Sequence, residues 1–331
     1  MTLTQEPAPA KAPPKQRRIG SVEILAALLV VVVLFRGPIT RSLSTPVLQT
    51  WLTVFVSVMT QAMPFLVLGV VLSAIIAVFV PPSFFARALP SHPALAVPAA
   101  GIAGVVLPGC ECASVPVAGA LVRRGVTPAA AFAFLLASPA VNPIVLVSTA
   151  VAFPGQPRVV IARAVTSLVV ACLMGWLWQA FGKGSWLRMP SRAHLDGMAK
   201  WPAFWASVRH DVLHAGGFLV IGAASAAVIA VVVPKSWLTN LAANAVVAIV
   251  VLGLLAVLLS ICSEADAFVA ASLTQFSMTA RLAFMVVGPM IDLKLFAMQA
   301  GIFGRSFALR FAPATFVLAI GVSAVLGPVL L

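Results

Sequence analysis

Long apolar runs, each ended by Pro, Gly or charged residues, dominate the chain. Uncharged stretches at residues 51–80, 127–153, 212–233 and 240–262 reach or exceed the ~20 residues that cross a bilayer as a helix. Strand-type alternation of apolar and polar positions is absent, which disfavours a β architecture. The pattern therefore predicts an all-α polytopic membrane protein.

One stretch departs from this pattern, at residues 107–124, with the sequence LPGCECASVPVAGALVRR. It places Cys110, Glu111 and Cys112 between two short apolar arms, residues 95–107 and 113–122. At 1.5 Å per residue each arm reaches only ~15–20 Å, well short of the ~30 Å hydrocarbon core. A re-entrant hairpin therefore fits the arms better than two full crossings.

The backbone of this hairpin is expected to be unwound at its tip. Two thiols one residue apart point to different sides of a regular helix, so Cys110 and Cys112 act together only where the helix is broken. Pro and Gly supply such breaks. The predicted break residues here are Pro108, Gly109 and Pro116.

The first half of the apolar sequence recurs in the second half. PFLVLGVVLSAIIAVFVPPSF, from Pro64, is matched by GFLVIGAASAAVIAVVVPKSW, from Gly217. Further on, Cys110 falls on Cys262, and SPAVN at 138–142 falls on GPMID at 288–292. This is an internal duplication, and it predicts a second set of helix breaks at Pro139, Pro143, Gly288 and Pro289.

Composition and charge set the orientation. The chain is 62% hydrophobic and 9% charged, with a mean hydropathy of +1.11. Its net charge of +13 is scattered over the ends of apolar runs, which argues against nucleic acid as a partner. If both hairpins return to the side they entered from, most of the 21 Lys and Arg residues face the cytoplasm, as the positive-inside rule requires.

On that reading the two repeats enter the membrane from opposite sides. They are then inverted repeats, each with a broken or re-entrant helical hairpin, an architecture of secondary transporters. The N-terminus is cytoplasmic. The expected divisions are a disordered basic tail at 1–18, a first transmembrane helix and loop at 19–50, repeat 1 at 51–182, a cytoplasmic linker at 183–210 and repeat 2 at 211–331.

Ionisable residues lie within or beside the apolar runs, where each is costly. They are Glu111, Glu264, Asp266, Asp292 and Lys294. One interpretation puts Glu264 and Asp266 in an aqueous loop and pairs Asp292 with Lys294 to hold the bundle together. The other has these groups line a water-filled cavity and carry protons or charge.

Three thiols are expected to converge at the equivalent breaks, those of Cys110, Cys112 and Cys262. Thiolates select soft species such as Cu(I), Zn(II) or trivalent metalloids. A permanent zinc site is disfavoured because four ligands are usual and no histidine lies in either break; small buried packing residues are the alternative. Asn142, Asp292 and Ser138 are expected to line the same site. His210 and His214 flank Asp211 and are interpreted as part of a helix start.

These motifs carry a resemblance to a known family. The PGCEC stretch ending in SVP, the SPAVNP segment and the sequence GPMIDLK at 288–294 resemble the ArsP/YraQ-type predicted permeases over about Met63 to Phe316. Members characterised as ArsP export trivalent organoarsenicals, with cysteine thiols thought to bind arsenic. The resemblance implies Cys110, Cys112 and Cys262 as ligands and Asp292 with Lys294 as an intramembrane ionic element, in a bacterial plasma membrane.

The sequence therefore predicts a permease that exports a soft, thiol-reactive solute, without cofactor, resident metal or enzymatic activity. Its expected partners are the bilayer, a small-molecule or metalloid substrate and, as an open option, further copies of itself. No nucleotide-binding loop occurs, so protons are the expected energy source. Two alternatives stay open: zinc or copper handling, and an intramembrane thiol oxidoreductase using Cys110 and Cys112.

Overall fold

The fold is known from a computed structural model that describes residues 46–90, 92–106, 111–189, 198–232 and 245–331. The chain divides into two units, residues 1–49 and 50–331, and the elements below belong to the second apart from the first turn of α3. Predictions for the basic tail, the first transmembrane helix, Cys110, Pro108 and Gly109 fall outside the described residues.

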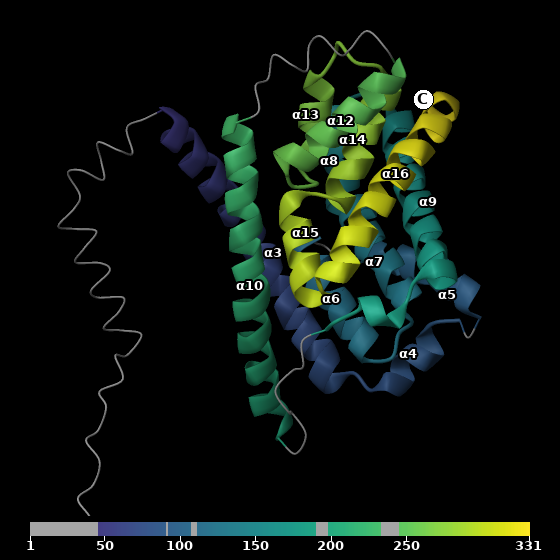
Figure 1. Ribbon diagram of the computed structural model, residues 1–331. Coiled ribbons are helices and arrows are strands. Elements are labelled where there is room, and N and C mark those ends of the chain that lie inside the picture. Colours follow the sequence, from purple (N-terminus) through teal and green to yellow (C-terminus); the bar gives the residue numbers. More distant parts are fainter. Residues whose placement is uncertain (1–45, 91, 107–110, 190–197, 233–244) are drawn as a thin grey trace, which may run out of the picture. The chain divides into compact units, whose positions relative to one another are not determined.

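Every regular element among the described residues is a helix, which confirms the predicted all-α class (Figure 1). The bounds of the first half are α3 Pro46–Phe79, α4 Pro82–Ala88, α5 Pro93–Ala103, η1 Gly104–Val106, α6 Glu111–Arg123, α7 Pro128–Val141, α8 Pro143–Ala152 and α9 Pro157–Phe181. After η2 Gly184–Trp186, those of the second half are α10 Lys200–Val232, α12 Ala245–Leu259, α13 Asp266–Ser272, α14 Met278–Met290, α15 Leu293–Ile302 and α16 Arg305–Leu330.

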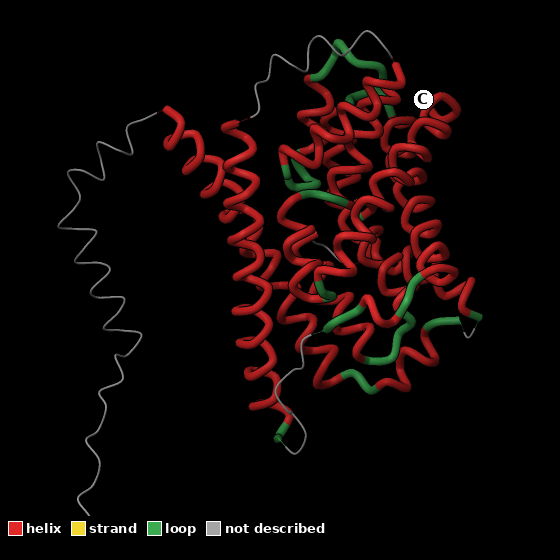
Figure 2. Tube along the Cα trace, in the orientation of Figure 1, coloured by secondary structure: helices red, strands yellow, loops and turns green. Residues whose placement is uncertain are grey.

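Six helices or helix pairs in the described part of the chain are long and apolar enough to cross a membrane. Four are the single helices α3, α9, α10 and α16; the other two are pairs, α7 with α8 and α14 with α15. Each pair is interrupted inside the span, at Asn142 and at Ile291–Asp292, and Figure 2 shows the loop segments that join the helices. Pro143 begins α8 directly after the first interruption, whereas Pro139, Gly288 and Pro289, which were expected at the breaks, lie inside the last turn of α7 and of α14.

Over their described residues, the remaining apolar helices are shorter than a full crossing. The helices α5, α6, α12 and α13 have 11, 13, 15 and 7 residues, which gives lengths between ~10 and ~22 Å against a ~30 Å core. Among the described residues both halves follow the order long helix, two short helices, interrupted crossing and long helix, and the first half has the short helix α4 in addition. The duplicated sequence has produced a duplicated order of elements.

A ring of aromatic side chains joins the two halves. Phe132 of α7 contacts Trp178 of α9 with ring centroids 5.0 Å apart. On its other sides it contacts the rings of Phe303, Phe307 and Phe311 at 4.7–5.3 Å. All five rings are at least nine-tenths buried. Aromatic pairs of this kind add ~0.5–1.5 kcal/mol each beyond area burial, so they fix the position of α16 against the first half.

The start of α10 differs from the sequence-based expectation. The helix α10 begins at Lys200 and not near His210, so His210 and Asp211 lie inside the helix and do not start it. Pro202 is compatible with this because proline is tolerated in a first helical turn. The first turns are further held by Trp201, which stacks on Phe204 with centroids 5.3 Å apart.

Helix α10 packs closely against α15 through a glycine. A Cβ added at Gly222 would collide with the Cα of Lys294, so the absence of a side chain lets the two helices approach at the residue that carries the buried ammonium.

Gly222→Ala is expected to lower stability by about 1–3 kcal/mol, the usual cost of overpacking, and to lower the melting temperature in detergent. The matched control is Gly217→Ala in the same helix, where an added Cβ meets no atom within 4 Å. The control should melt at or slightly above the wild-type temperature, because alanine favours helix over glycine. Equal melting of the two variants would contradict the close packing of α10 on α15.

Candidate functional site: a buried ionic cluster at the helix breaks

Lys294 lies at the centre of the candidate site, in the first turn of α15, with no exposed surface. Its Nζ is 2.6 Å from Oε1 of Glu111 and 3.1 Å from Oδ2 of Asp292. Both carboxylates are also fully buried. The ion pair between Asp292 and Lys294 that the sequence suggested is present, and Glu111 joins it from the other half of the chain.

The second hairpin supplies the remaining contacts of the ammonium. Nζ donates to the carbonyl oxygen of Ser260 at 3.0 Å and to Sγ of Cys262 at 3.8 Å. Lys294 also interacts electrostatically with Cys112. One ammonium therefore contacts the first residue of α6, the break before α13 and the break before α15.

Local structure explains why the acidic residues sit where they do. Asp292 is the N-cap of α15, where its Oδ1 accepts from the backbone N–H of Leu295 at 2.6 Å. Asn142 is the N-cap of α8 and accepts from Val145 N at 3.0 Å. Glu111 and Asp266 are the first residues of α6 and α13. Carboxylates and amide oxygens are favoured at helix N-termini by capping and by the helix dipole.

Ser260 gives the second break its shape. It has φ +47°, the only non-glycine residue with a left-handed φ among those described. Such a conformation is costly for a residue with a Cβ and marks a position held by its surroundings. Here the Ser260 Oγ accepts from Leu293 N at 3.3 Å while its carbonyl faces Lys294, so the unwound segment is fixed to the start of α15.

A second buried ion pair lies beside the first. Arg163 of α9 is fully buried, and one of its Nη atoms is 2.7 Å from Oδ2 of Asp266. Glu264 is half-buried and interacts electrostatically with Glu111, Lys294 and Arg163. The interpretation that placed Asp266 in an aqueous loop is wrong, because only 1% of Asp266 is exposed.

Charge balance distinguishes this site from ordinary structural ion pairs. Four carboxyl groups, of Glu111, Glu264, Asp266 and Asp292, face two cations, Lys294 and Arg163. Helix N-termini offset part of the excess, at about half an elementary charge each. Glu111 Oε2, Asp266 Oδ1 and Glu264 Oε1 have no hydrogen-bond partner in the described structure. The site therefore has spare acceptors for protons or a cationic group.

The thiols are placed as follows. Cys112 is fully buried in the first turn of α6, and Cys262, 5% exposed in the second break, has its sulfur 3.8 Å from the Lys294 ammonium. Cys172, 7% exposed in α9, is part of the apolar core. Among the described residues no group of three or more His, Cys, Asp or Glu side chains is arranged to hold a metal ion.

Of the other predicted site residues, some lie near helix interruptions and one lies inside a continuous helix. Ser138 and Asn142 are buried at the end of α7, and Asn142 Nδ2 donates to the carbonyl of Ser138 at 3.2 Å. Gly288 faces the Arg163–Asp266 ion pair, since a Cβ added at Gly288 would be 3.6 Å from Oδ2 of Asp266. Pro116, by contrast, lies inside α6, which continues without interruption from Glu111 to Arg123.

Arg163 is the residue of this site that the sequence analysis did not single out. It lies in α9, a helix otherwise apolar enough to cross the membrane. A lone arginine inside such a span is a signal for a buried partner or an aqueous cavity, but the sequence does not say which acid it meets.

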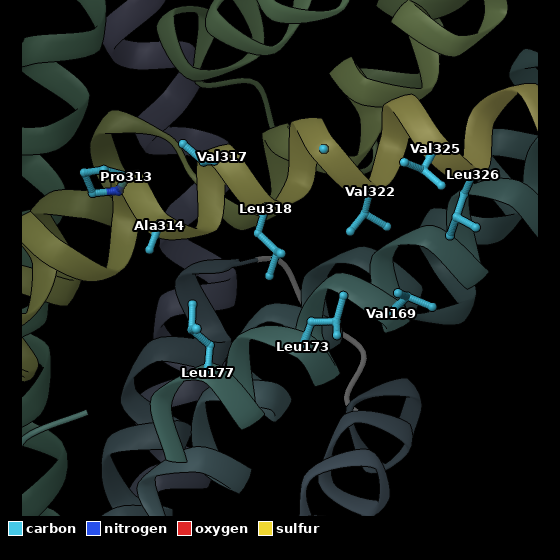
Figure 3. Close-up of a pocket in the computed structure, with 11 residues that line it drawn as sticks. Val169, Leu173, Leu177, Pro313, Ala314, Val317, Leu318, Val322, Val325 and Leu326 are labelled. Carbon is cyan, nitrogen blue, oxygen red and sulfur yellow. The ribbon is translucent and has the colours of Figure 1, made fainter. Parts of the chain in front are cut away.

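A separate apolar groove lies between α9 and α16 (Figure 3). It has a volume of about 910 Å³, and the residues that line it, among them Leu173, Leu318 and Val322, are all apolar. It offers neither a charge nor a soft donor, so it suits lipid acyl chains and does not qualify as the site of a polar or thiol-reactive solute.

Comparison with known proteins agrees with the architecture. The sequence matches ArsP_1, described as predicted permease, over residues 47–330. The chain belongs to this permease family. It is 36% identical over 262 residues to the UPF0718 protein YcgR of Bacillus subtilis (77% of this chain, 89% of the relative). It is 32% identical over 277 residues to a Streptococcus mutans protein named "Putative two-component membrane permease complex subunit" (81% and 92%). No solved structure matches it.

Lys294→Gln is expected to destabilise this permease strongly, because it leaves Glu111 and Asp292 buried without their cation. Removing one partner of a buried pair costs about 3–5 kcal/mol. The double variant Lys294→Gln/Asp292→Asn should recover part of that loss, since it restores the original net charge of the cluster. Arg305→Gln, at an exposed position of α16, is the control and should melt like the wild type. Equal stability of all three variants would contradict the cluster.

Proposed function

We propose that this permease exports a soft, thiol-reactive solute such as a trivalent organoarsenical by alternating access. The observation that carries the proposal is the meeting at Lys294 of the start of α6, through Glu111, with the breaks before α13 and α15, where the Cys262 sulfur is 3.8 Å from the ammonium. Broken helices that meet inside the membrane are the usual substrate sites of secondary transporters.

In this mechanism the substrate binds to the thiols and leaves when the halves move against each other. Cys112 belongs to the first hairpin and Cys262 to the second, so a metalloid held by both links the two repeats. Trivalent metalloids are thiophilic, whereas the carboxylates and the ammonium disfavour an apolar solute. Cys110 is a third candidate ligand from the sequence.

Protons are the proposed coupling ion. The site has more carboxyl groups than cations, and several buried oxygens have no hydrogen-bond partner in the described structure. Taking up a proton at Glu111, Glu264, Asp266 or Asp292 lowers the excess negative charge, and losing it restores that charge. The inverted arrangement of the repeats, which alternating access uses, is supported by Figure 1, where α5 and α6 lie toward one end of the body and α12 and α13 toward the other.

Uptake of trivalent methylarsenite into everted membrane vesicles tests the proposal. Cys112→Ser and Cys262→Ser are expected to reduce uptake at least tenfold, because each removes one sulfur ligand. Cys172→Ser, at a thiol in the apolar core, is the matched control and should transport like the wild type. A protonophore should abolish uptake if protons drive the exchange.

The same vesicles separate the alternatives. If the wild type takes up Zn²⁺ or Cu⁺ and not the arsenical, and the Cys262→Ser variant loses that uptake, the protein is a metal transporter. Full arsenical uptake by both cysteine variants would show that the thiols only pack.

A second candidate function rests on the name of the Streptococcus relative, which describes a subunit of a two-component complex. On this proposal the chain works with a partner subunit. Isolating the chain from its native membrane in mild detergent should then recover a second polypeptide in stoichiometric amount. Recovery of the chain alone, with full arsenical transport after reconstitution, would contradict it.

A further inference from the structure

Arg163 is the only buried cation of the described site for which neither the sequence nor the proposed transport assigns a role. It donates from Nη1 to Thr149 Oγ1 at 2.8 Å, and from Nη2 to the carbonyl of Ser263 at 3.2 Å and to Asp266 Oδ2 at 2.7 Å. One guanidinium thus joins α9, α8 and the second hairpin, which lie in different halves of the chain.

The contacts with the second half fall on the segment that carries Cys262. Ser263 is the next residue, and Asp266 N donates to the Cys262 carbonyl at 3.1 Å. Lys294 holds the same segment from the other side, through the Ser260 carbonyl and the Cys262 sulfur. The unwound segment between α12 and α13 is therefore fixed at both ends by cations, one from each half of the chain.

We propose that Arg163 is a positioning residue of the substrate site: it holds the 260–265 break so that the Cys262 thiol stays buried beside Lys294. This role rests on the proposed function, because it gives the Cys262 ligand its orientation. The Arg163–Asp266 pair links the two halves and must loosen when the break moves. Arg163 acts on Cys262 through its contacts with Ser263 and Asp266.

The geometry requires arginine in particular. The guanidinium presents several N–H donors in a rigid planar fork, whereas a lysine ammonium is a compact point charge. Lysine at this position keeps a positive charge for Asp266 but cannot reach Thr149 and the Ser263 carbonyl in the same way. Thr149→Val removes one acceptor of the fork without changing the charge, so it isolates the positioning effect from the charge effect.

The test measures thiol reactivity in the purified full chain, with N-ethylmaleimide as the probe and peptide mass spectrometry to read each cysteine separately. In the wild type Cys262 should react slowly, because it is 5% exposed. Arg163→Gln is expected to raise the Cys262 rate at least tenfold. Arg163→Lys and Thr149→Val should raise it about threefold, and Asp266→Asn should resemble Arg163→Gln because it breaks the same pair.

Three internal controls make the result specific. Arg158→Gln changes an exposed arginine near the start of the same helix and should leave all rates unchanged. Cys172 of α9 reports on global loosening, and Cys112 on the first hairpin; both should keep their wild-type rates. An unchanged Cys262 rate in Arg163→Gln and Thr149→Val overturns the proposal. So does a parallel rise at all three thiols, which would make Arg163 a residue of general stability.

This measurement does not depend on the identity of the substrate. If Cys262 becomes reactive in Arg163→Gln while the wild type transports no arsenical, the positioning role stands and the proposed substrate fails. If the wild type transports the arsenical but the Cys262 rate does not change, the proposed function stands and the role of Arg163 fails. Should Arg163→Gln not fold, Thr149→Val, which creates no unpaired charge, decides the question.

Discussion

The cost of placing charged groups inside a membrane protein governs the centre of this fold. Lys294 and Arg163 are both completely buried, and each is retained only because carboxylates and carbonyls surround it. Carbonyl oxygens outside regular helices are not already engaged in an intrahelical bond, so they are well suited to accept from a cation. The unwound segment at 260–265 supplies two of them, from Ser260 and Ser263, and the break at 291–292 supplies the carboxylate of Asp292. The helix breaks therefore provide contacts to both buried cations.

The arrangement of the two cations is reciprocal. Glu111, in the hairpin of the first half, is paired with Lys294 from the second half. Asp266, in the hairpin of the second half, is paired with Arg163 from the first. The helices pack in the same reciprocal way: α6 of the first half contacts α15 of the second, and α13 of the second half contacts α8 of the first. Each hairpin is thus held by the opposite repeat, so movement of one half changes the surroundings of both breaks.

Much of this was accessible from the sequence, because Pro, Gly and a sudden polar residue leave clear signals in apolar runs. The sequence predicts short arms around Glu111 and interruptions near Pro143 and Pro289; the structure has short helices on either side, and its interruptions fall at Asn142 and, two to three residues after Pro289, at Ile291–Asp292. The partner of Arg163 was not predictable, since it lies 103 positions away in the sequence. The helix α10 begins at Lys200, inside the expected linker, because aromatic residues there support it: Trp201 stacks on Phe204, and Phe204 contacts Phe79 of α3.

The contacts of Lys294 suit the two conformations that the proposed alternating access requires. Four acceptor atoms surround the ammonium, from Glu111, Asp292, Ser260 and Cys262, yet a lysine has only three N–H donors. At least one acceptor is therefore without a full hydrogen bond at any time. Because these acceptors belong to three separate segments, a small shift of one hairpin exchanges one partner for another without leaving the ammonium unpaired. A buried cation with surplus partners is the kind of element that allows two discrete arrangements of similar energy.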